Sequence, residues 1–304
     1  MSDDSAVLII AGPTASGKTE LAIQLAREFD AEVVGADSRQ IYAGMPIGTA
    51  SPSVRQQAEV PHHLIGFLDP RRRYSAAQYA EDAIAALIAI RARGKRAIVA
   101  GGTGFYIRAL MGGVALAPQY DEPLRNRLAR EALLHPSEFL HEWLGCRDAA
   151  RAGALEKNDT YRVLRALEIA LAPAALVRDA ATRTLSSEGF RYELVFLDVD
   201  RATLDERIER RTARMLDDGL IEEAERIGDG VVAASAVGYP QAHAYLRGWS
   251  TLAELRSSLT RATRRYARRQ RAWFRGEPST LWLPAEAVRS VVREKLGWSS
   301  KRAV

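Results

Sequence analysis

The hydrophobic positions of this chain fall into four short continuous runs, separated by long stretches in which apolar and polar residues alternate. The runs are AVLII (6–10), AEVVGADS (31–38), RAIVAGG (96–102) and YELVFLDV (192–199). Uninterrupted runs of this length are typical of strands that a parallel sheet buries on both faces. They predict four strands of one parallel sheet.

Helical patterns lie between these runs. Segment 19–29 places apolar residues at helical spacing, and segment 75–94 begins with Ser75 and Gln78 at the spacing of a capping box and stops at Gly94. Strands that alternate with helices predict an α/β fold. We therefore expect a P-loop-type parallel sheet core flanked by helices.

The middle of the chain has a different pattern. Segments 122–134, 136–144 and 159–172 are helical in spacing, and no buried strand separates them. We expect residues 118–189 to form an inserted helical domain that interrupts a catalytic core made of residues 1–117 and 190–304.

Composition narrows the class of protein. The 304 residues are 47% hydrophobic and 27% charged, with a net charge of +5, which weakly favours a nucleic-acid or phosphorylated partner. The single cysteine, Cys146, excludes an intrachain disulfide and a cysteine-based zinc site, and we expect it to be a buried small hydrophobe. No apolar segment reaches about 18 residues, and the acidic start is unlike a signal peptide. We expect a soluble, cytoplasmic protein.

The first run leads into GPTASGKT, which matches the phosphate-binding pattern G-x-x-x-x-G-K-T between a strand and a helix. Backbone N–H groups of such a loop surround phosphates at a helix N-terminus, Lys18 supplies a charge, and the Thr19 hydroxyl can hold Mg²⁺. The predicted phosphate-binding residues are Gly12, Pro13, Thr14, Ala15, Ser16, Gly17, Lys18 and Thr19. The loop alone leaves open a kinase, an ATPase or a transferase acting on a diphosphate.

Polar residues follow the other predicted strands, where an open parallel sheet binds ligands. Asp37 is a candidate general base or, alternatively, a loop cap. Thr103 can reach a substrate in the cleft or cap the next helix. The third strand ends without an acid, and Asp198 at the fourth is more typical of a strand-end cap than of a metal ligand, which weakens the ATPase interpretation.

Two segments are rich in arginine. In RATRRYARRQRAWFRG (261–276), Arg261, Arg264, Arg265 and Arg268 share one helical face without any glutamate, which favours a polyanion over a plain surface helix. In RIERRTARML (207–216), the side chains that share a face are Arg207, Arg211 and Arg214. They can close over phosphates as a lid or pair with acids such as Glu222.

Together these segments resemble the tRNA dimethylallyltransferase (tRNA isopentenyltransferase) family. The resemblance covers almost the whole chain and is carried, in order, by GPTASGKTEL, ADSRQIYAGMPIGTA, VPHHLIGFLDP with YSAAQY, GGTGFY, NDTYRVLRALE, RIERRTARML, SAVGYPQ and YARRQRAWF. It implies transfer of a dimethylallyl group from dimethylallyl diphosphate to N6 of the adenosine immediately 3′ of the tRNA anticodon, with release of diphosphate. It also implies a bacterial-type chain, without the zinc-finger tail of eukaryotic members.

The resemblance assigns roles to residues. Asp37 matches the general base, and Thr103 matches the residue that orients the amine. Lys18 and Arg211 match the cations that contact the diphosphate. Thr19 matches the residue whose hydroxyl lies on the side of the Mg²⁺ ion. We expect tRNA contacts in segments 37–40, 161–165 and 235–240, at Arg125 and on the basic helix. The predicted residues are Asp37, Ser38, Arg39, Gln40, Thr103, Arg125, Tyr161, Arg162, Arg165, Gly238, Tyr239, Arg268 and Arg269. We expect a monomer that uses Mg²⁺ and grips the anticodon stem-loop with the helical insertion.

Three places depart from the family pattern: Ser51 stands where a lysine is usual, Glu156-Lys157 replaces a His-Pro pair, and segment 171–179 lacks a Gly-Lys pair. Three other hypotheses remain open at this stage. A small-molecule kinase fits the loop but leaves the arginine helix unexplained. A prenyltransferase for free adenylate needs neither the insertion nor the basic helix. A non-catalytic RNA-binding protein leaves the reactive residues without a use.

Overall fold

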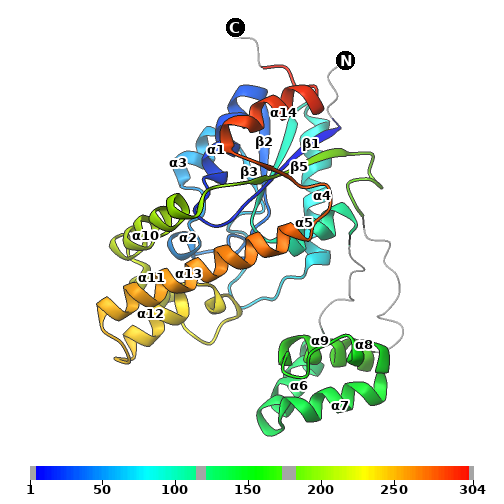
Figure 1. Ribbon diagram of the computed structural model, residues 1–304, viewed down its shortest axis with the longest axis vertical. Helices are drawn as coiled ribbons and strands as arrows, with labels where there is room; N and C mark the ends of the chain where they lie inside the picture. The colour runs from blue at the N-terminus through cyan, green and yellow to red at the C-terminus, as the bar shows by residue number, and fades with distance from the viewer. Residues whose placement is uncertain (1–4, 114–120, 173–182, 301–304) are drawn as a thin grey trace. The chain divides into compact units, whose positions relative to one another are not determined.

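The computed structural model describes residues 5–113, 121–172 and 183–300 and contains a six-stranded sheet (Figure 1). The strand order is β3-β2-β4-β1-β5-β6, and every neighbouring pair is parallel. The bounds are β1 Ala6–Ala11, β2 Ala31–Gly35, β3 His62–His63, β4 Arg96–Gly101, β5 Arg191–Leu197 and β6 Leu281–Leu283. The predicted parallel sheet is confirmed, and β1 lies between β4 and β5 at its centre.

The second predicted run is shorter than expected, because β2 ends at Gly35 and leaves Asp37 and Ser38 in the following loop. Strands β3 and β6 were not predicted. Each has only two or three residues, too few for a hydrophobic period to show.

Both helices predicted in the first part of the chain are confirmed as α1 (Lys18–Phe29) and α4 (Ala76–Ala92). The capping box at the start of α4 is present: Gln78 N donates to Ser75 Oγ at 3.1 Å and Ser75 N donates to Gln78 Oε1 at 2.9 Å. Gly94 has a φ of +67°, a left-handed conformation that favours glycine after a helix end.

The remaining helices around the sheet are α2 (Pro46–Thr49), α3 (Val54–Glu59), α5 (Gly104–Met111), α10 (Arg201–Asp217), α11 (Leu220–Ile227), α12 (Tyr239–Leu246), α13 (Leu252–Arg275) and α14 (Val288–Lys295), with 3₁₀ turns at Val232–Ser235 and Ala285–Ala287. One face of the sheet, including Leu8 and Ile10, packs with Phe29 of α1 and Val292 of α14. Side chains that alternate with these, such as Ile9, are equally buried. Burial on both faces explains the continuous apolar runs.

Helices α6 (Glu122–Leu134), α7 (Ser137–Arg147), α8 (Ala149–Gly153) and α9 (Thr160–Leu171) form a separate compact unit. Its core includes Leu128, Leu140, Leu144 and Leu167. Residues 183–189, which we expected at the end of the insertion, belong to the unit that contains the sheet. The expected boundary at 117/118 and most of segment 171–179 lie outside the described residues.

The prediction that Cys146 is buried is wrong, because this free cysteine is exposed. Leu140 and Leu144 define the buried side of α7, and Cys146 follows Leu144 by two positions, which turns it about 200° away from that side. None of the helices in the described part of the chain combines the length and the apolar character that a bilayer crossing requires.

Candidate active site

The phosphate-binding loop connects the buried end of β1 to the start of α1. Ala15 and Gly17 have φ values of +65° and +91°, which bend the backbone tightly. A Cβ atom on Gly12 would lie 2.9 Å from Ser16 Oγ and 3.2 Å from Leu197 Cβ, so any larger residue would crowd these two side chains. The strand, loop and helix therefore have the arrangement that the sequence predicts for phosphate binding.

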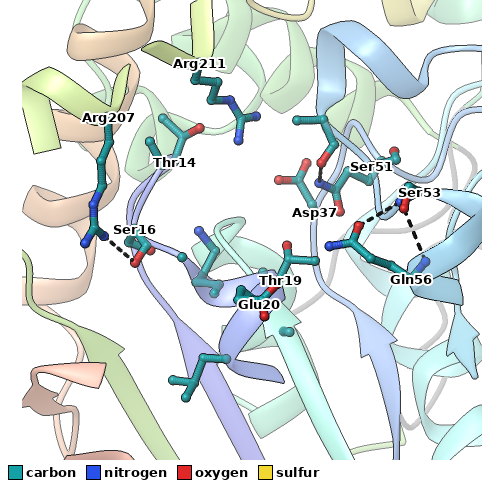
Figure 2. A pocket seen from close by; sticks show the side chains of 18 of the residues that line it. Thr14, Ser16, Thr19, Glu20, Asp37, Ser51, Ser53, Gln56, Arg207 and Arg211 are labelled. Carbon is teal, nitrogen blue, oxygen red and sulfur yellow. Dashed lines mark hydrogen bonds between the residues drawn. The ribbon is translucent and has the colours of Figure 1, made fainter. Parts of the chain in front are cut away.

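A cavity of about 960 Å³ opens beside this loop (Figure 2). The loop residues from Thr14 to Thr19 line it, together with Asp37 and Gln40 from the loop after β2. Four arginines of α10 complete one wall: Arg207, Arg210, Arg211 and Arg214. Gly12 and Pro13 shape the loop without lining the cavity. The cavity thus joins predicted diphosphate-binding residues to the predicted general base.

Two cations in the cavity are destabilised by burial. Burial lowers the pKa of Lys18 to about 8, the Asp37 carboxylate opposes this shift, and Arg211 adds to it. Burial also lowers the pKa of Arg211, whose Nε atom has no hydrogen-bond partner. A polyanion in this cavity would stabilise the charges that burial disfavours and would give the Nε atom of Arg211 a partner.

The face of α10 with Arg207, Arg211 and Arg214 lines the cavity, and its closing over phosphates stays a prediction. Arg207 donates from a guanidinium nitrogen to the carbonyl of Ser16 at 3.3 Å, and Arg211 donates to that of Thr49 at 3.4 Å. In the described part of the chain, none of the three pairs with Glu222, so the alternative of internal ion pairing is not what the structure shows.

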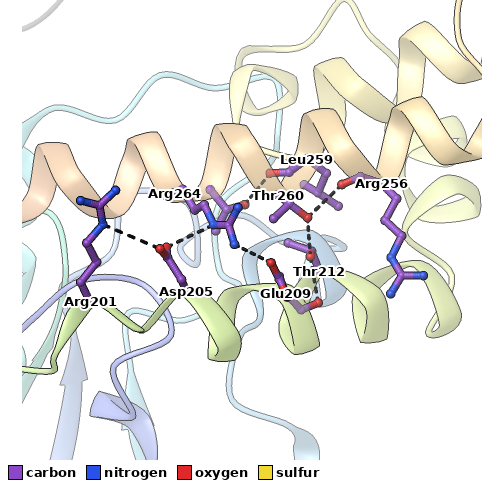
Figure 3. Close-up of polar contacts among 9 residues, drawn as sticks. Arg201, Asp205, Glu209, Thr212, Arg256, Leu259, Thr260 and Arg264 are labelled. Atoms are coloured by element: carbon purple, nitrogen blue, oxygen red, sulfur yellow. Dashed lines mark hydrogen bonds and ion pairs between the residues drawn. The ribbon is translucent and has the colours of Figure 1, made fainter. Parts of the chain in front are cut away.

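The opposite face of α10 is held by α13 (Figure 3). Arg264 contacts Asp205 at 3.1 Å and Glu209 at 2.5 Å, and the hydroxyls of Thr212 and Thr260 lie 3.0 Å apart. Arg264 therefore does not belong to a free basic face, because the acids that balance it are on another helix. Its contacts instead join α13 to the side of α10 that faces away from the cavity-lining arginines.

A second arginine of α13 is also paired. Arg271 contacts the carboxylate of Asp198 at 2.9 Å, and Asp198 is absent from the cavity lining. The exposed arginines of this helix are Arg256, Arg261, Arg265, Arg268, Arg269 and Arg275. The polyanion interpretation therefore depends on these six.

Asp37 and Thr103 follow the ends of the adjacent strands β2 and β4, and of the two only Asp37 lines the cavity. Asp37 Oδ1 accepts from Arg39 N at 2.9 Å, and the carboxylate also lines the cavity, so both alternatives for this residue have a basis. Thr103 Oγ1 accepts from Ser38 N at 2.9 Å and makes no side-chain cap to α5. The capping alternative for Thr103 is therefore not what the structure shows.

Tyr266 and Gln270 of α13 reach this site, although neither was predicted as a site residue from the sequence. Tyr266 hydrogen-bonds Thr103, and burial and the Asp37 carboxylate raise the pKa of its hydroxyl. Gln270 accepts from Thr14 N at 2.8 Å. Both residues are uncharged and stand among arginines in the sequence. That difference from their neighbours was the only local sign that they face the protein and not the solvent.

The loop between β2 and β3 closes another side of the cavity. Gln40 donates to the carbonyls of Thr49 and Ala50 at 3.2 and 3.0 Å. Ser51, where the family pattern has a lysine, lines the cavity with its hydroxyl 2.8 Å from that of Thr49. The departure therefore removes a cation from the cavity wall.

A buried carboxylate holds the same loop. Glu223 accepts from Ile47 N at 3.0 Å, from Gly48 N at 2.7 Å and from the Tyr239 hydroxyl at 2.7 Å. Tyr239 is 0% exposed, so its side chain is a structural element and not part of an RNA-contacting surface. Gly238, with a φ of +112°, is the N-cap residue that precedes α12.

The predicted tRNA contacts between positions 125 and 165 lie in the helical unit. Arg125 and Arg165 both pair with the buried Glu168, at 2.8 and 2.6 Å. Tyr161 is 63% exposed and lies under the Arg125 guanidinium, whereas Arg162 pairs with Asp159. These residues form one basic and aromatic cluster, and its contact with tRNA stays a prediction.

Comparison with known proteins agrees with this geometry. A family model described as IPP transferase matches residues 40–277. tRNA dimethylallyltransferase 1 of Pelobacter propionicus is 42% identical over 91% of this chain and 92% of its own length. tRNA dimethylallyltransferase of Geobacter sulfurreducens is 40% identical over 91% of both chains.

Solved structures are also similar. The tRNA isopentenylpyrophosphate transferase of Bacillus halodurans superposes with a TM-score of 0.69 at 32% identity, covering 96% of this chain and 97% of that one. A eukaryotic dimethylallyltransferase acting on tRNA shares the fold, with a TM-score of 0.73 at 22% identity over 94% of this chain and 75% of that one. These matches favour the transferase over the kinase, the free-adenylate enzyme and the non-catalytic protein. The chain belongs to the IPP transferase family, as an enzyme of the tRNA dimethylallyltransferase type.

Proposed function

We propose that this protein transfers the dimethylallyl group of dimethylallyl diphosphate to N6 of the adenosine immediately 3′ of the tRNA anticodon. One observation carries the proposal: the Asp37 carboxylate lines the same cavity as Lys18 and Arg211. A base for the acceptor amine and cations for the leaving group are both needed in such a transfer, and they share one cavity here.

In the proposed reaction, a bond forms between N6 and C1 of the dimethylallyl group while the bond from C1 to the diphosphate oxygen breaks. The bonding electrons leave with diphosphate, and the N6 proton passes to Asp37. Lys18 and Arg211 stabilise the negative charge that grows on the leaving group.

The acceptor needs such help because the lone pair of an exocyclic amine is delocalised into the adenine ring. The base must also leave the stack of the anticodon loop to enter the cavity. Thr103, beside Ser38 and Tyr266, supplies a hydroxyl that can orient the amine. The exposed Arg268 and Arg269 are suited to contact the tRNA backbone.

Mg²⁺ is a further part of the proposal. In the described residues no group of three or more His, Cys, Asp or Glu side chains could hold a metal ion. The Thr19 hydroxyl lines the cavity, and Mg²⁺ commonly binds through one or two protein groups and substrate phosphates. Thr19 and the diphosphate oxygens would hold the ion, which would neutralise phosphate charge.

We also propose a cytoplasmic monomer that binds the anticodon stem-loop of tRNA. The phosphate loop, Asp37 and the arginines of α10 line one cavity of a single chain, which supports the monomer. The cluster around Arg125 and Tyr161 supports an RNA contact by the helical unit, since aromatic and basic side chains together bind unstacked bases and phosphates.

The test mixes purified protein, Mg²⁺, dimethylallyl diphosphate and unmodified tRNA, digests the tRNA and searches for isopentenyladenosine by mass spectrometry. A parallel reaction contains ATP in place of the prenyl donor. We expect the prenylated nucleoside with the prenyl donor only. ATP consumption without any prenylated nucleoside, over a panel of tRNAs, would overturn the proposal.

A further inference from the structure

Gln270 joins two loops that are far apart in the chain. Its Oε1 atom accepts from Thr14 N at 2.8 Å, and its Nε2 atom donates to the carbonyl of Gly102 at 3.0 Å. The residue is 5% exposed, although the neighbouring Arg269 and Arg271 are charged. Both ends of one buried amide are therefore used to connect the phosphate loop with the turn after β4.

The turn after β4 is shaped to receive α13. A Cβ atom on Gly102 would lie 2.1 Å from Gln270 Nε2, and one on Gly104 would lie 2.2 Å from Trp273 Cε3. Both glycines are therefore required for this close approach. Gln270 and Trp273 lie about one helical turn apart, so α13 contacts the turn along a single face.

One of the two connected loops is on the diphosphate side of the proposed reaction, and the other is on the side of the acceptor amine. Thr14 belongs to the loop that contains Lys18, and Gly102 directly precedes Thr103. Thr103 is in turn held beside the loop that contains Asp37, because Thr103 N donates to the Ala36 carbonyl at 3.1 Å. The relative placement of these loops sets the distance between a diphosphate donor and an amine held near Thr103 and Asp37.

We propose that Gln270 is a positioning residue that holds the phosphate loop and the Gly102–Thr103 turn in register for prenyl transfer. The proposal rests on the proposed function for its consequence in turnover. Gln270 also lines the cavity, but the two loops use both polar ends of its amide, so we assign it no contact with the reacting atoms and no proton transfer. Its contribution is to keep the two substrate sites at a reactive distance, where small displacements cost much rate.

The first test measures single-turnover kinetics with enzyme in excess over tRNA. Gln270→Met has nearly the same volume but neither hydrogen-bonding group. We expect its rate constant to fall on the order of 10- to 100-fold, with tRNA affinity unchanged. A role in folding alone would lower the amplitude of product formed and leave the rate constant of the active molecules unchanged.

The control is Thr263→Val on the same helix. Thr263 is 6% exposed, and its hydroxyl donates at 2.9 Å to Leu259 within α13, so it connects no loops. We expect its rate constant to match that of the wild type. If Gln270→Met does not fold, Gln270→Glu takes its place, because it keeps an acceptor for Thr14 and loses the donor to Gly102.

Hydrogen exchange provides a second measurement that does not depend on the reaction. In Gln270→Met we expect protection to fall together in residues 12–19 and 101–105, and in neither segment for Thr263→Val. Unchanged protection in both segments, or a rate constant within twofold of wild type, would overturn the positioning role. A wild-type protein that forms no prenylated nucleoside would refute the proposed function instead, while hydrogen exchange still decides whether Gln270 joins the loops.

Discussion

The ammonium group of Lys18 donates to the carbonyl of Pro13 at 2.8 Å, so the principal cation of the phosphate loop is bound by the loop itself. This contact holds a charge that burial makes unfavourable, with the pKa of Lys18 near 8. An incoming diphosphate would meet a lysine that is only partly protonated at mildly alkaline pH. The charge of the cavity therefore depends on pH.

Diphosphate binding is expected to take up a proton at Lys18 near pH 8. A bound anion raises the lysine pKa above about 8, so affinity should decrease as pH rises through this value, by up to about tenfold per pH unit for one proton. Calorimetry in buffers of different ionisation heat measures the uptake. Lys18→Met is the control, and equal proton uptake by this variant would show that the ligand itself titrates.

Asp37→Asn is expected to lose transfer by roughly 100- to 10,000-fold while tRNA affinity is retained. The amide oxygen can still accept from Arg39 N, so the loop keeps its conformation but lacks a base. Rapid-quench product analysis and filter binding measure the two effects. Asp69→Asn, an acid outside the cavity, serves as the matched control and should retain full activity. Wild-type turnover in Asp37→Asn would contradict the assignment.

Arg211→Ala is expected to lower kcat/KM for the prenyl donor by roughly 100-fold, because it removes a buried cation from the leaving-group side of the cavity. Arg201→Ala removes an exposed arginine from the same helix, outside the cavity, and should have little effect. Steady-state kinetics with varied dimethylallyl diphosphate separate the two. Equal values for both variants would remove Arg211 from the diphosphate site.

Arg269 and Arg264 lie on the same helix and should behave differently. Arg269→Ala removes an exposed cation and should reduce the slope of log affinity for tRNA against log salt by about one. Arg264→Ala removes the contacts with Asp205 and Glu209, should leave the salt slope unchanged and should cost about 1 kcal/mol of stability or less. Fluorescence titrations over a range of salt, with melting temperatures, distinguish these outcomes.

Tyr239→Phe is expected to reduce the free energy of unfolding by about 1–3 kcal/mol. The lost hydroxyl donates to the buried carboxylate of Glu223, which also holds the backbone of Ile47 and Gly48. Urea unfolding measures the change. Tyr245→Phe, on the same helix and half-buried, is the comparison and should cost less; the same loss in both variants would exclude a specific role of the Glu223 contact.

Local signals predicted most of the fold. The apolar runs located β1, β2, β4 and β5, and a capping box located the start of α4. β3 and β6 are defined by pairing with longer neighbours, so their own residues carry no period. Cys146 was misplaced because composition gives the average burial of a residue type, whereas its position on α7 decides its exposure.

The sequence by itself determined the phosphate loop, the candidate roles of Lys18, Asp37 and Thr103, and the alternation of strands and helices, because each depends on residues close together in the chain. Only the tertiary structure decided which arginines are free, since the acids that pair with Arg264 and Arg271 lie on α10 and at the end of β5. It also decided that Gln270 contacts Thr14, 256 positions away. Such partners are chosen by how helices pack, and no local pattern records that choice.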